Sequence, residues 1–289
     1  MVEPFDPNQV VSILCGEPVA RWTPVSGGDV HIAGRATLAS GRVLFAKVHP
    51  GPPPELFAVE AEGLQWLTDV GGAPTPAVVA VSSRVEGPGG LVLDWVERCA
   101  AGDAHQVSLA RVLADMHSVR GDRPGWTQDG FIGPLPQPNH PLSDSWPHFW
   151  RDRRLGWGLK LAAPHLSGTA SALVSEAMER IDQLLMGHGS MAPLHGDLWS
   201  GNVVYGAAGP YLIDPAPYVG DPEVDLAMMS LFGGFGAAFW EAYGAARPQR
   251  VGWRRRRAVY QLWPLLVHVA LFGRAYDGQL VATAQRALA

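Results

Sequence analysis

The stretch "PLHGDLWSGNVVY", residues 193–205, decides how this chain is read. It holds a His, an Asp, a Trp and an Asn within eight positions, directly before an apolar run. Asn is rare in the chain and occurs only at positions 8, 139 and 202. One of these few Asn residues therefore stands five positions after Asp197, and that spacing needs a chemical reason.

Phosphoryl transfer supplies such a reason. The catalytic loops of phosphotransferases carry an Asp and an Asn at this separation. The carboxylate accepts the proton of the attacking hydroxyl, and the Asn oxygen is a ligand for Mg²⁺. A second carboxylate is expected after a short hairpin, and "VVYGAAGPYLIDPA" supplies Asp214 after a strand, a turn and a strand. Mg²⁺ prefers oxygen ligands. The pattern thus predicts Asp197 as catalytic base, with Asn202 and Asp214 as the metal ligands.

Each of these residues also has a structural interpretation when it is taken alone. Asp197 could cap a turn, and Asp214 precedes a proline, as turn-forming residues often do. His195 is interpreted as structural in either case, holding the loop by hydrogen bonds. The joint pattern, with an apolar hairpin of suitable length between Asp197 and Asp214, favours the catalytic interpretation.

The first half of the chain offers the remaining parts of a nucleotide site. Of the 22 basic residues only Lys47 and Lys160 are lysines, so a compact ammonium is expected at Lys47, where it reaches phosphates. Glu60 is predicted to pair with Lys47, because Glu60 lies on the apolar stripe of its helix while Glu62 points away. The predicted nucleotide-binding residues are Gly27 and Gly28 in a turn over the phosphates, Lys47, Glu60, and the backbone groups of Asp94 and Val96 beside the adenine.

Periodicity predicts an α+β fold of two lobes. Three short strands, a helix following residue 55 and two further strands make up the first hundred residues. Most of the remainder is predicted as helix, apart from a long ordered loop over residues 121–144. Residues 171–186 are predicted as one helix, and the last long helix is expected to be interrupted at Pro264. We place a nucleotide-binding lobe with its hinge at residues 1–97 and a helical lobe with the catalytic loop and substrate pocket at residues 98–289.

Composition bounds the class of protein. The 289 residues are 47% hydrophobic, and the net charge of −5 argues against nucleic acid as a partner. No apolar run approaches the ~20 residues that span a bilayer, and we find no secretory signal. Two cysteines fit a reducing cytoplasm. The basic run at residues 253–257 is interpreted as a solvated helix face. The oligomeric state is not fixed by the sequence, and a monomer is compatible with it.

Several blocks of the chain resemble one known family. They include "HGDLWSGN", "GWTQDGFIGPLPQPN", "DPAPYVGDPEVDLAMMSLFGGF" and "LVHVALFGRAY". Together with "GGD" and "FAVEAEGLQWL" they are similar to the fructosamine kinase (ketosamine-3-kinase) family, a branch of the aminoglycoside-phosphotransferase and protein-kinase-like fold. The similarity extends over nearly the whole chain. It implies a bilobal fold, with a small antiparallel-sheet lobe carrying one helix and a larger, mainly helical lobe.

The resemblance also implies a reaction and its cofactors. ATP with Mg²⁺ would phosphorylate O3 of a ketosamine, free or protein-bound, such as fructosamine or ribulosamine, and the 3-phosphate would make the adduct break down and free its amine. It implies that Trp199 forms part of the sugar-amine pocket, whereas its structural interpretation is a core aromatic side chain that braces the loop. Asp221 and Asp225 are interpreted as a helix cap and a loop anchor. Four positions depart from the common family pattern, namely His31, Gly34, Val219 and Pro222.

The sequence is also compatible with two alternative functions. The first is a small-molecule kinase of the aminoglycoside or choline type, which would share the Asp-Asn-Asp pattern. The second is a nucleotide-binding pseudokinase, against which the intact set of predicted site residues argues.

Overall fold

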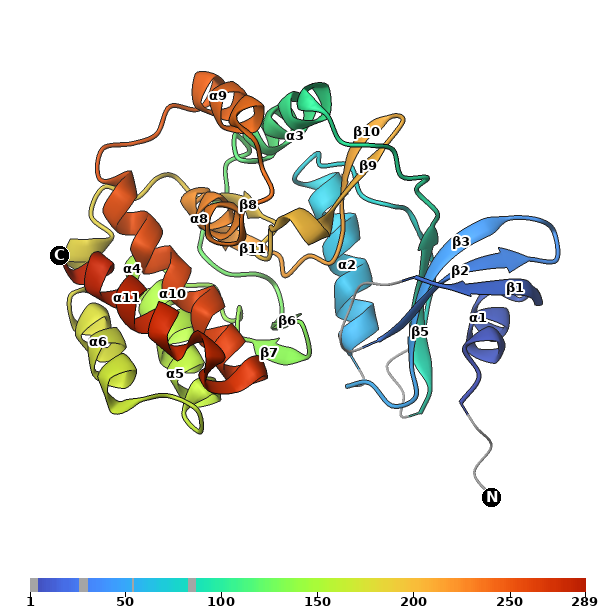
Figure 1. Ribbon diagram of the computed structural model, residues 1–289, viewed down its shortest axis with the longest axis horizontal. Helices are drawn as coiled ribbons and strands as arrows, with labels where there is room; N and C mark the ends of the chain where they lie inside the picture. Colours follow the sequence, from blue (N-terminus) through green and yellow to red (C-terminus); the bar gives the residue numbers. More distant parts are fainter. Residues whose placement is uncertain (1–4, 26–30, 54, 83–86) are drawn as a thin grey trace.

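The computed structural model describes residues 5–25, 31–53, 55–82 and 87–289. It has two lobes, a sheet-containing N-terminal lobe and a helical C-terminal lobe (Figure 1). The N-terminal sheet has five antiparallel strands in the order β1-β2-β3-β5-β4. Its strands are β1 (Val19–Pro24), β2 (Ile32–Leu38), β3 (Val43–His49), β4 (Val78–Val81) and β5 (Gly89–Asp94). The three-strand, helix, two-strand order predicted from the sequence is confirmed.

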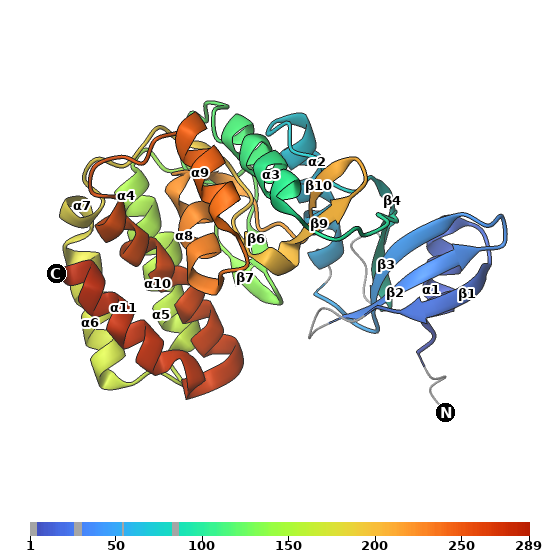
Figure 2. The same ribbon diagram turned by 45° about the horizontal axis from the view of Figure 1, so that its top comes forward.

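The two faces of this sheet are covered by different helices. Helix α1 (Pro7–Cys15) packs on one face through Val11, against alternate residues of β3 such as Leu44 and Ala46. Helix α2 (Leu56–Asp69) packs on the other face, where Phe57 and Leu64 form a second apolar cluster. Because side chains alternate along a strand, Lys47 lies on the α2 face, the one nearer the helical lobe (Figures 1 and 2).

Helix α1 was not predicted, although its ends carry ordinary sequence signals. The Asp6 carboxylate accepts a hydrogen bond from the backbone N–H of Asn8 at 2.9 Å, and Pro7 follows at the first helical position. Gly16 ends the helix with a φ of 66°, which is the left-handed conformation typical of a helix end.

The C-terminal lobe is built mainly from helices, with three short antiparallel strand pairs. The pairs are β6 (Gly130–Ile132) with β7 (Leu135–Gln137), β8 (Ala192–Leu194) with β11 (Tyr218–Gly220), and β9 (Val203–Gly206) with β10 (Gly209–Leu212). The helices are α3 (Asp103–Met116), α4 (Trp146–Phe149), α5 (Trp157–Ala162), α6 (Gly168–Glu179), α7 (Ile181–Leu184), α8 (Glu223–Phe232), α9 (Ala237–Ala246), α10 (Trp253–Phe272) and α11 (Asp277–Leu288), with a π-helical segment η1 (Trp150–Gly156) and the short 3₁₀ segments η2 (Ser200–Asn202) and η3 (Gly273–Tyr276). The α+β bilobal fold predicted from the sequence is confirmed, while the boundary at residue 97 stays a prediction.

Two helix predictions were wrong in detail. Residues 171–186 form two helices, because Arg180 leaves the helical conformation and lets both Ile181 and Leu184 reach the core. Helix α10 runs through Pro264 without interruption. An interior proline costs a helix about 3 kcal/mol, but Trp263 and Leu265 on either side are fully buried, and this packing outweighs the cost.

The basic run at residues 253–257 is also not a uniformly solvated face. Arg256 is buried, and its Nε and Nη2 donate to the two carboxylate oxygens of Glu223 at 2.7 and 2.9 Å. A buried carboxylate needs a paired cation, so one arginine of the run joins the start of α10 to the start of α8. Arg254 is exposed, as predicted for the whole run.

Candidate active site

The catalytic loop predicted from the sequence lies between β8 and β9, and Asp225 of α8 holds its start. The two carboxylate oxygens of Asp225 accept the backbone N–H groups of His195 and Gly196, each at 2.9 Å. Gly196 has a φ of 81°, and a Cβ there would lie 2.0 Å from the carbonyl oxygen of Ala216. The turn therefore requires glycine. Asp225 is the loop anchor that the sequence predicts.

His195 connects this loop to the strand that precedes Asp214. Its Nε2 lies 2.9 Å from the carbonyl oxygen of Ile213, which can only accept, so Nε2 carries the proton. Its Nδ1 then accepts the backbone N–H of Asp197 at 3.2 Å. Burial lowers the pKa of His195, which keeps the ring neutral in this arrangement. The structural role predicted for His195 is confirmed.

Asn202 lies directly beside Asp197. Its Nδ2 donates to the backbone carbonyl of Asp197 at 2.8 Å and to the carboxylate Oδ2 at 3.2 Å. The backbone carbonyl of Asn202 accepts the N–H of Ile213 at 3.1 Å. The amide nitrogen is thus fully used within the loop, and the amide oxygen Oδ1 is left as a potential metal ligand.

Asp214 adopts an unusual backbone conformation. Its φ of 55° makes it the single non-glycine residue with positive φ in the described part of the chain. Such conformations are costly for most residues, and Asp is among those that tolerate them. Asp214 is followed by Pro215 and contacts Lys47 of β3 through its carboxylate. The strained turn thereby directs this carboxylate towards the N-terminal lobe.

Lys47 also makes the ion pair with Glu60 that the sequence predicts. Its Nζ donates to Oε1 of Glu60 in α2 at 2.7 Å. The rejected alternative, Glu62, is exposed and accepts a hydrogen bond from Gln128 instead. Burial alone would lower the pKa of Lys47, but the carboxylates of Asp214 and Glu60 outweigh burial and hold this pKa above its ordinary value. The ammonium is therefore fixed and charged.

Asp197 has the electrostatics of a proton acceptor. Burial, the largest effect, and the nearby negative charge of Asp214 raise the pKa of Asp197 to about 8. The hydrogen bond from Asn202 lowers this pKa, but by less. A general base works best when its pKa lies near the pH at which it operates. The environment of Asp197 thus matches the role predicted for it.

A cavity of about 300 Å³ between the lobes brings together three of the six predicted nucleotide residues, Lys47, Asp94 and Val96. Lys47, Asn202 and Asp214 line one end, and Asp94 and Val96 line the other. The side chains of Phe45, Leu93, Val204 and Ile213 form apolar walls suited to a flat base. The backbone N–H of Asp94 already donates to Ala77 at 2.9 Å, so its carbonyl is the group left for a ligand. Gly27 and Gly28 lie outside the described residues.

Trp199 stands between this cavity and a second one that contains Asp197. Its side chain is 41% exposed, so it is not the buried core aromatic of the structural interpretation. The indole ring rests on Gly201, where a Cβ would lie 2.2 Å from the ring. A residue larger than glycine at 201 would displace the indole.

The oxygen donors present fit Mg²⁺. Nowhere in the described ranges do three or more His, Cys, Asp or Glu side chains gather into a metal-binding group. Asn202 and Asp214 line the same cavity and together offer an amide oxygen and a carboxylate. Mg²⁺ is commonly held by one or two such ligands plus substrate phosphates.

No helix among the described residues is long and apolar enough to cross a membrane.

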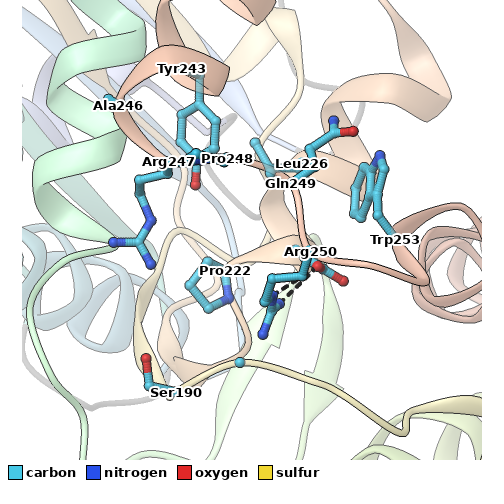
Figure 3. Close-up of a pocket in the computed structure, with 12 residues that line it drawn as sticks. Ser190, Pro222, Leu226, Tyr243, Ala246, Arg247, Pro248, Gln249, Arg250 and Trp253 are labelled. Carbon is cyan, nitrogen blue, oxygen red and sulfur yellow. Dashed lines mark hydrogen bonds and ion pairs between the residues drawn. The ribbon is translucent and has the colours of Figure 1, made fainter.

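A further cavity of about 330 Å³ lies beside the start of α8 (Figure 3). Arg250 lines it and forms ion pairs with Asp221 and Glu223. Its Nη2 lies 2.6 Å from Oδ1 of Asp221. Asp221 also accepts the backbone N–H of Glu223 at 3.0 Å, which is the helix-capping role predicted for it. The charged side chains that line this cavity are Glu223, Arg247 and Arg250, and none of the predicted site residues lines it.

Sequence reasoning missed the far wall of the second cavity. His268, Phe272 and Tyr276 line it from α10 and η3. The three aromatic residues are spaced four apart, which places them on one face of a helix. That spacing is the sequence signal from which this wall could be predicted.

The protein has an antiparallel-sheet lobe with a Lys–Glu pair, and this lobe faces a helical lobe with the Asp–Asn loop and a following Asp. This combination defines a phosphotransferase of the protein-kinase-like fold. Within this class the chain belongs to the fructosamine kinase family, whose model matches residues 7–289.

Its relatives support this placement. A probable ketoamine kinase of Synechocystis sp. is 35% identical, with 94% of this chain and 92% of the relative covered. The chloroplastic protein-ribulosamine 3-kinase of Oryza sativa is 31% identical over 92% of this chain and 82% of its own. A solved structure from Thermobifida fusca, assigned as a fructosamine-3-kinase, superposes with a TM-score of 0.87 at 36% identity, covering 98% of both chains. The aminoglycoside phosphotransferase APH(4)-Ia, at 14% identity and a TM-score of 0.66, shares the fold.

Proposed function

We propose that the protein is an ATP-dependent kinase that phosphorylates the O3 hydroxyl of ketosamines such as fructosamine or ribulosamine adducts. One observation carries the proposal. Asp197, Asn202 and Asp214 are joined by hydrogen bonds through His195 and Ile213, and Asp214 contacts the Lys47–Glu60 pair of the other lobe. The names of the relatives as ketoamine and ribulosamine kinases support the choice of acceptor.

The nucleotide half of the reaction depends on positioning and charge. The adenine would occupy the apolar end of the inter-lobe cavity, next to Asp94 and Val96. Lys47, held by Glu60, would bind phosphate oxygens and offset their negative charge. Electrostatic stabilisation of this kind is the main contribution that a protein makes to phosphoryl transfer.

The acceptor half depends on Asp197. Its carboxylate would accept the proton of the O3 hydroxyl while that oxygen forms a bond to the γ-phosphorus, and the bond to the β–γ bridging oxygen breaks to release ADP. Asn202 orients this carboxylate by donating to its Oδ2. Mg²⁺, when bound through Asn202 and Asp214, would supply charge neutralisation at the β- and γ-phosphates.

An aminoglycoside acceptor is less well supported. Aminoglycosides carry several ammonium groups, and a site for them needs several carboxylates. Among the described residues that line the second cavity, which contains Asp197, this Asp is the single acid. A pseudokinase is disfavoured because Lys47, Glu60, Asp197, Asn202 and Asp214 are all present.

The consequence of the reaction would be repair. The resemblance implies that a ketosamine phosphorylated at O3 breaks down and frees its amine. Breakdown of the kinase product would thus return a glycated amine to its original state.

Cys15 and Cys99 are both free thiols, and the cytoplasmic location expected from the sequence stays a prediction.

The test is ATP consumption with a ribulosamine or fructosamine substrate, with the position of the phosphate determined by NMR. Asp197→Asn should lower kcat by about 10²- to 10⁴-fold, the range typical of a lost general base. Equal rates for Asp197→Asn and the parent protein would refute the role of Asp197. Turnover of aminoglycosides or amino alcohols alone would refute the ketosamine assignment.

A further inference from the structure

The cavity beside the start of α8 lies where three segments of the helical lobe meet (Figure 3). Gly189 and Ser190, just before β8, form one side, and Pro222 and Glu223 at the start of α8 form the second. The third side is made by residues 243–253, from the end of α9 to the start of α10. The cavity has a volume of about 330 Å³. A ligand in it would therefore contact all three segments at once.

The charged groups of this cavity leave one cation without a counter-charge. Glu223 is the acid among the described residues that line it, and its two carboxylate oxygens already accept hydrogen bonds from Arg256, at 2.7 and 2.9 Å. Arg247 donates from Nη1 to Oγ of Ser118 at 2.9 Å, and it forms no ion pair with an acid in the described part of the chain. An anion is the group that would complement Arg247.

Arg250 adds a second guanidinium group to the same wall. Its Nη2 lies 2.6 Å from Oδ1 of Asp221, while its Nη1 is buried with no hydrogen-bond acceptor among the described residues. Gly189 permits this position, because a Cβ there would lie 1.9 Å from Nη1. Figure 3 shows Arg247, Arg250 and Ser190 around one opening. Two guanidinium groups and a hydroxyl are donors suited to the oxygens of a phosphate or a carboxylate.

The remaining walls of the cavity are apolar and partly flat. They are formed by Leu226, Pro248 and the rings of Tyr243 and Trp253. Both rings belong to buried side chains, so their positions are fixed by the core. Walls of this kind gain free energy by covering apolar surface of a ligand. The cavity therefore suits an oxyanion that carries a small apolar body better than it suits an inorganic ion.

Tyr243 connects this cavity to the catalytic loop. Its ring lines the cavity, and its hydroxyl oxygen lies 2.8 Å from Nδ1 of His117. The other ring nitrogen of His117 lies 3.2 Å from Oδ2 of Asp225. The carboxylate of Asp225 in turn accepts the backbone N–H groups of His195 and Gly196. A continuous chain of hydrogen bonds thus runs from the wall of the cavity to the start of the catalytic loop.

We propose that this cavity binds a small organic oxyanion, and that the bound ligand steadies the catalytic loop through Tyr243 and His117. Arg247 and Arg250 would hold the anionic group, and the apolar body would pack on the ring of Tyr243. A restrained ring keeps its hydroxyl on His117, which supports Asp225 in holding the loop. The cavity shares no lining residue with the inter-lobe cavity or the second cavity. The inference thus goes beyond the proposed function and does not rest on it.

Isothermal titration calorimetry with phenyl phosphate and with benzoate tests the site, with ADP and Mg²⁺ present to occupy the inter-lobe cavity. At least one of the two compounds should bind, and the tighter one identifies the preferred anionic group. Benzyl alcohol lacks the charge and inorganic phosphate lacks the ring, so each should bind at least about fivefold more weakly. No binding of phenyl phosphate or benzoate in the millimolar range would overturn the inference. Equally tight binding of inorganic phosphate would mean that the cavity is not a site for an organic ligand.

A matched pair of arginine variants locates the binding. Arg247→Gln should raise the Kd of the tighter compound by about tenfold or more, because a charge-assisted hydrogen bond is lost. Arg254→Gln removes the same charge from an exposed residue that does not line this cavity, and it should leave Kd unchanged. An unchanged Kd in Arg247→Gln would show that the compound binds elsewhere. Equal effects of the two variants would reduce the binding to general surface charge, and either result would overturn the site.

Hydrogen exchange at the backbone amides of His195 and Gly196 tests the connection to the loop. A saturating amount of the tighter compound should slow this exchange about threefold or more, while the amides of β3 in the other lobe should not change. Tyr243→Phe keeps the ring but removes the hydroxyl, so it should retain a similar Kd and lose the effect on exchange. Exchange that does not respond in the parent protein, or that slows equally in Tyr243→Phe, would overturn the connection through Tyr243 and His117.

Discussion

His195 and Ile213 join the two halves of the catalytic centre. The imidazole Nε2 donates to the carbonyl oxygen of Ile213 at 2.9 Å, and the other ring nitrogen accepts the backbone N–H of Asp197 at 3.2 Å. One neutral side chain thus fixes the distance between the loop that carries Asp197 and the turn that carries Asp214. The geometry of the proposed site depends on a residue that touches neither substrate nor nucleotide.

The first prediction concerns this connection. His195→Ala should lower kcat by about tenfold to a hundredfold, because small displacements of a reacting group are costly. It should also reduce the free energy of unfolding by about 2–4 kcal/mol, from the cavity and the two lost hydrogen bonds. Steady-state kinetics and urea unfolding measure both effects. His188→Ala, at an exposed site, should change neither. An unaltered kcat in His195→Ala would show that the loop holds its position without this link.

The second prediction concerns Asp225, whose carboxylate accepts two backbone N–H groups and lies 3.2 Å from Nε2 of His117. Burial raises its pKa, but the hydrogen bond and charge of His117, with the contributions of His195 and Gly196, outweigh burial and hold this pKa below its ordinary value. A lowered pKa means that the carboxylate stabilises the fold at neutral pH, and that this contribution is lost as pH falls below the ordinary value of about 4.

Asp225→Asn should therefore destabilise the protein at pH 7 by about 2–3 kcal/mol, because an amide cannot accept both N–H groups. The difference in Tm between parent and variant should shrink as the pH is lowered towards 4 and below. Differential scanning calorimetry over pH 3.5–8 measures it. A Tm difference that is constant over this range would mean that Asp225 contributes no proton-linked stability.

Much of this site could be predicted from the sequence because its residues are local in the chain. Asp197, Asn202 and Asp214 lie within one loop and one hairpin, and the Lys47–Glu60 pair joins a strand to the next helix. The backbone bond from Ile213 to Asn202 and the positive φ of Asp214 could not be predicted, because they arise when the hairpin folds back on the loop.

Tertiary packing explains the errors in the fold. An interior proline usually ends a helix. Helix α10 nevertheless continues through Pro264, because the core surrounds the helix there. Arg256 looks no different in sequence from the exposed Arg254 or the half-buried Arg255 and Arg257. It is buried because Glu223, distant in the chain, requires a buried partner. Such pairings appear only when two segments meet in space.

The third prediction concerns the turn at Gly196. Gly196→Ala should prevent correct folding of the loop or cost about 3 kcal/mol or more, since its Cβ would overlap the Ala216 carbonyl and its φ is positive. Soluble yield and Tm are the measurements. Gly278→Ala is the matched control, because it lies in α11 with open space around it. That change should be neutral or stabilising by up to about 1 kcal/mol. Similar Tm values for the two variants would contradict the steric argument.

The fourth prediction separates the roles of Lys47 and Glu60. Lys47→Met should lower kcat/KM for ATP by about 10²-fold or more, because a phosphate-binding charge is lost. Glu60→Gln should lower it by about tenfold, since the ammonium keeps only Asp214 as a charged partner. If Glu60 acts through Lys47, the double variant should be no worse than Lys47→Met alone.

Glu62→Gln is the control for this pair, because it removes an exposed acid from the same helix and should leave kcat/KM unchanged. Additive losses in the double variant would show that Glu60 contacts the nucleotide independently of Lys47. A larger loss from Glu62→Gln than from Glu60→Gln would mean that the partner of Lys47 changes during the reaction.

The fifth prediction concerns the metal. Asn202 leaves Oδ1 free while Nδ2 holds Asp197, so Asn202→Ala should raise the Mg²⁺ concentration for half-maximal activity by about tenfold or more. Full removal of Mg²⁺ by EDTA should abolish turnover, and added Mg²⁺ should restore it. Activity measured against free Mg²⁺ at saturating ATP gives the comparison. Asn8→Ala, in α1 and far from the cavity, should leave the Mg²⁺ dependence unchanged. If Asn202→Ala lowers kcat but leaves the half-maximal Mg²⁺ concentration as in the parent, Asn202 orients Asp197 and is not a metal ligand.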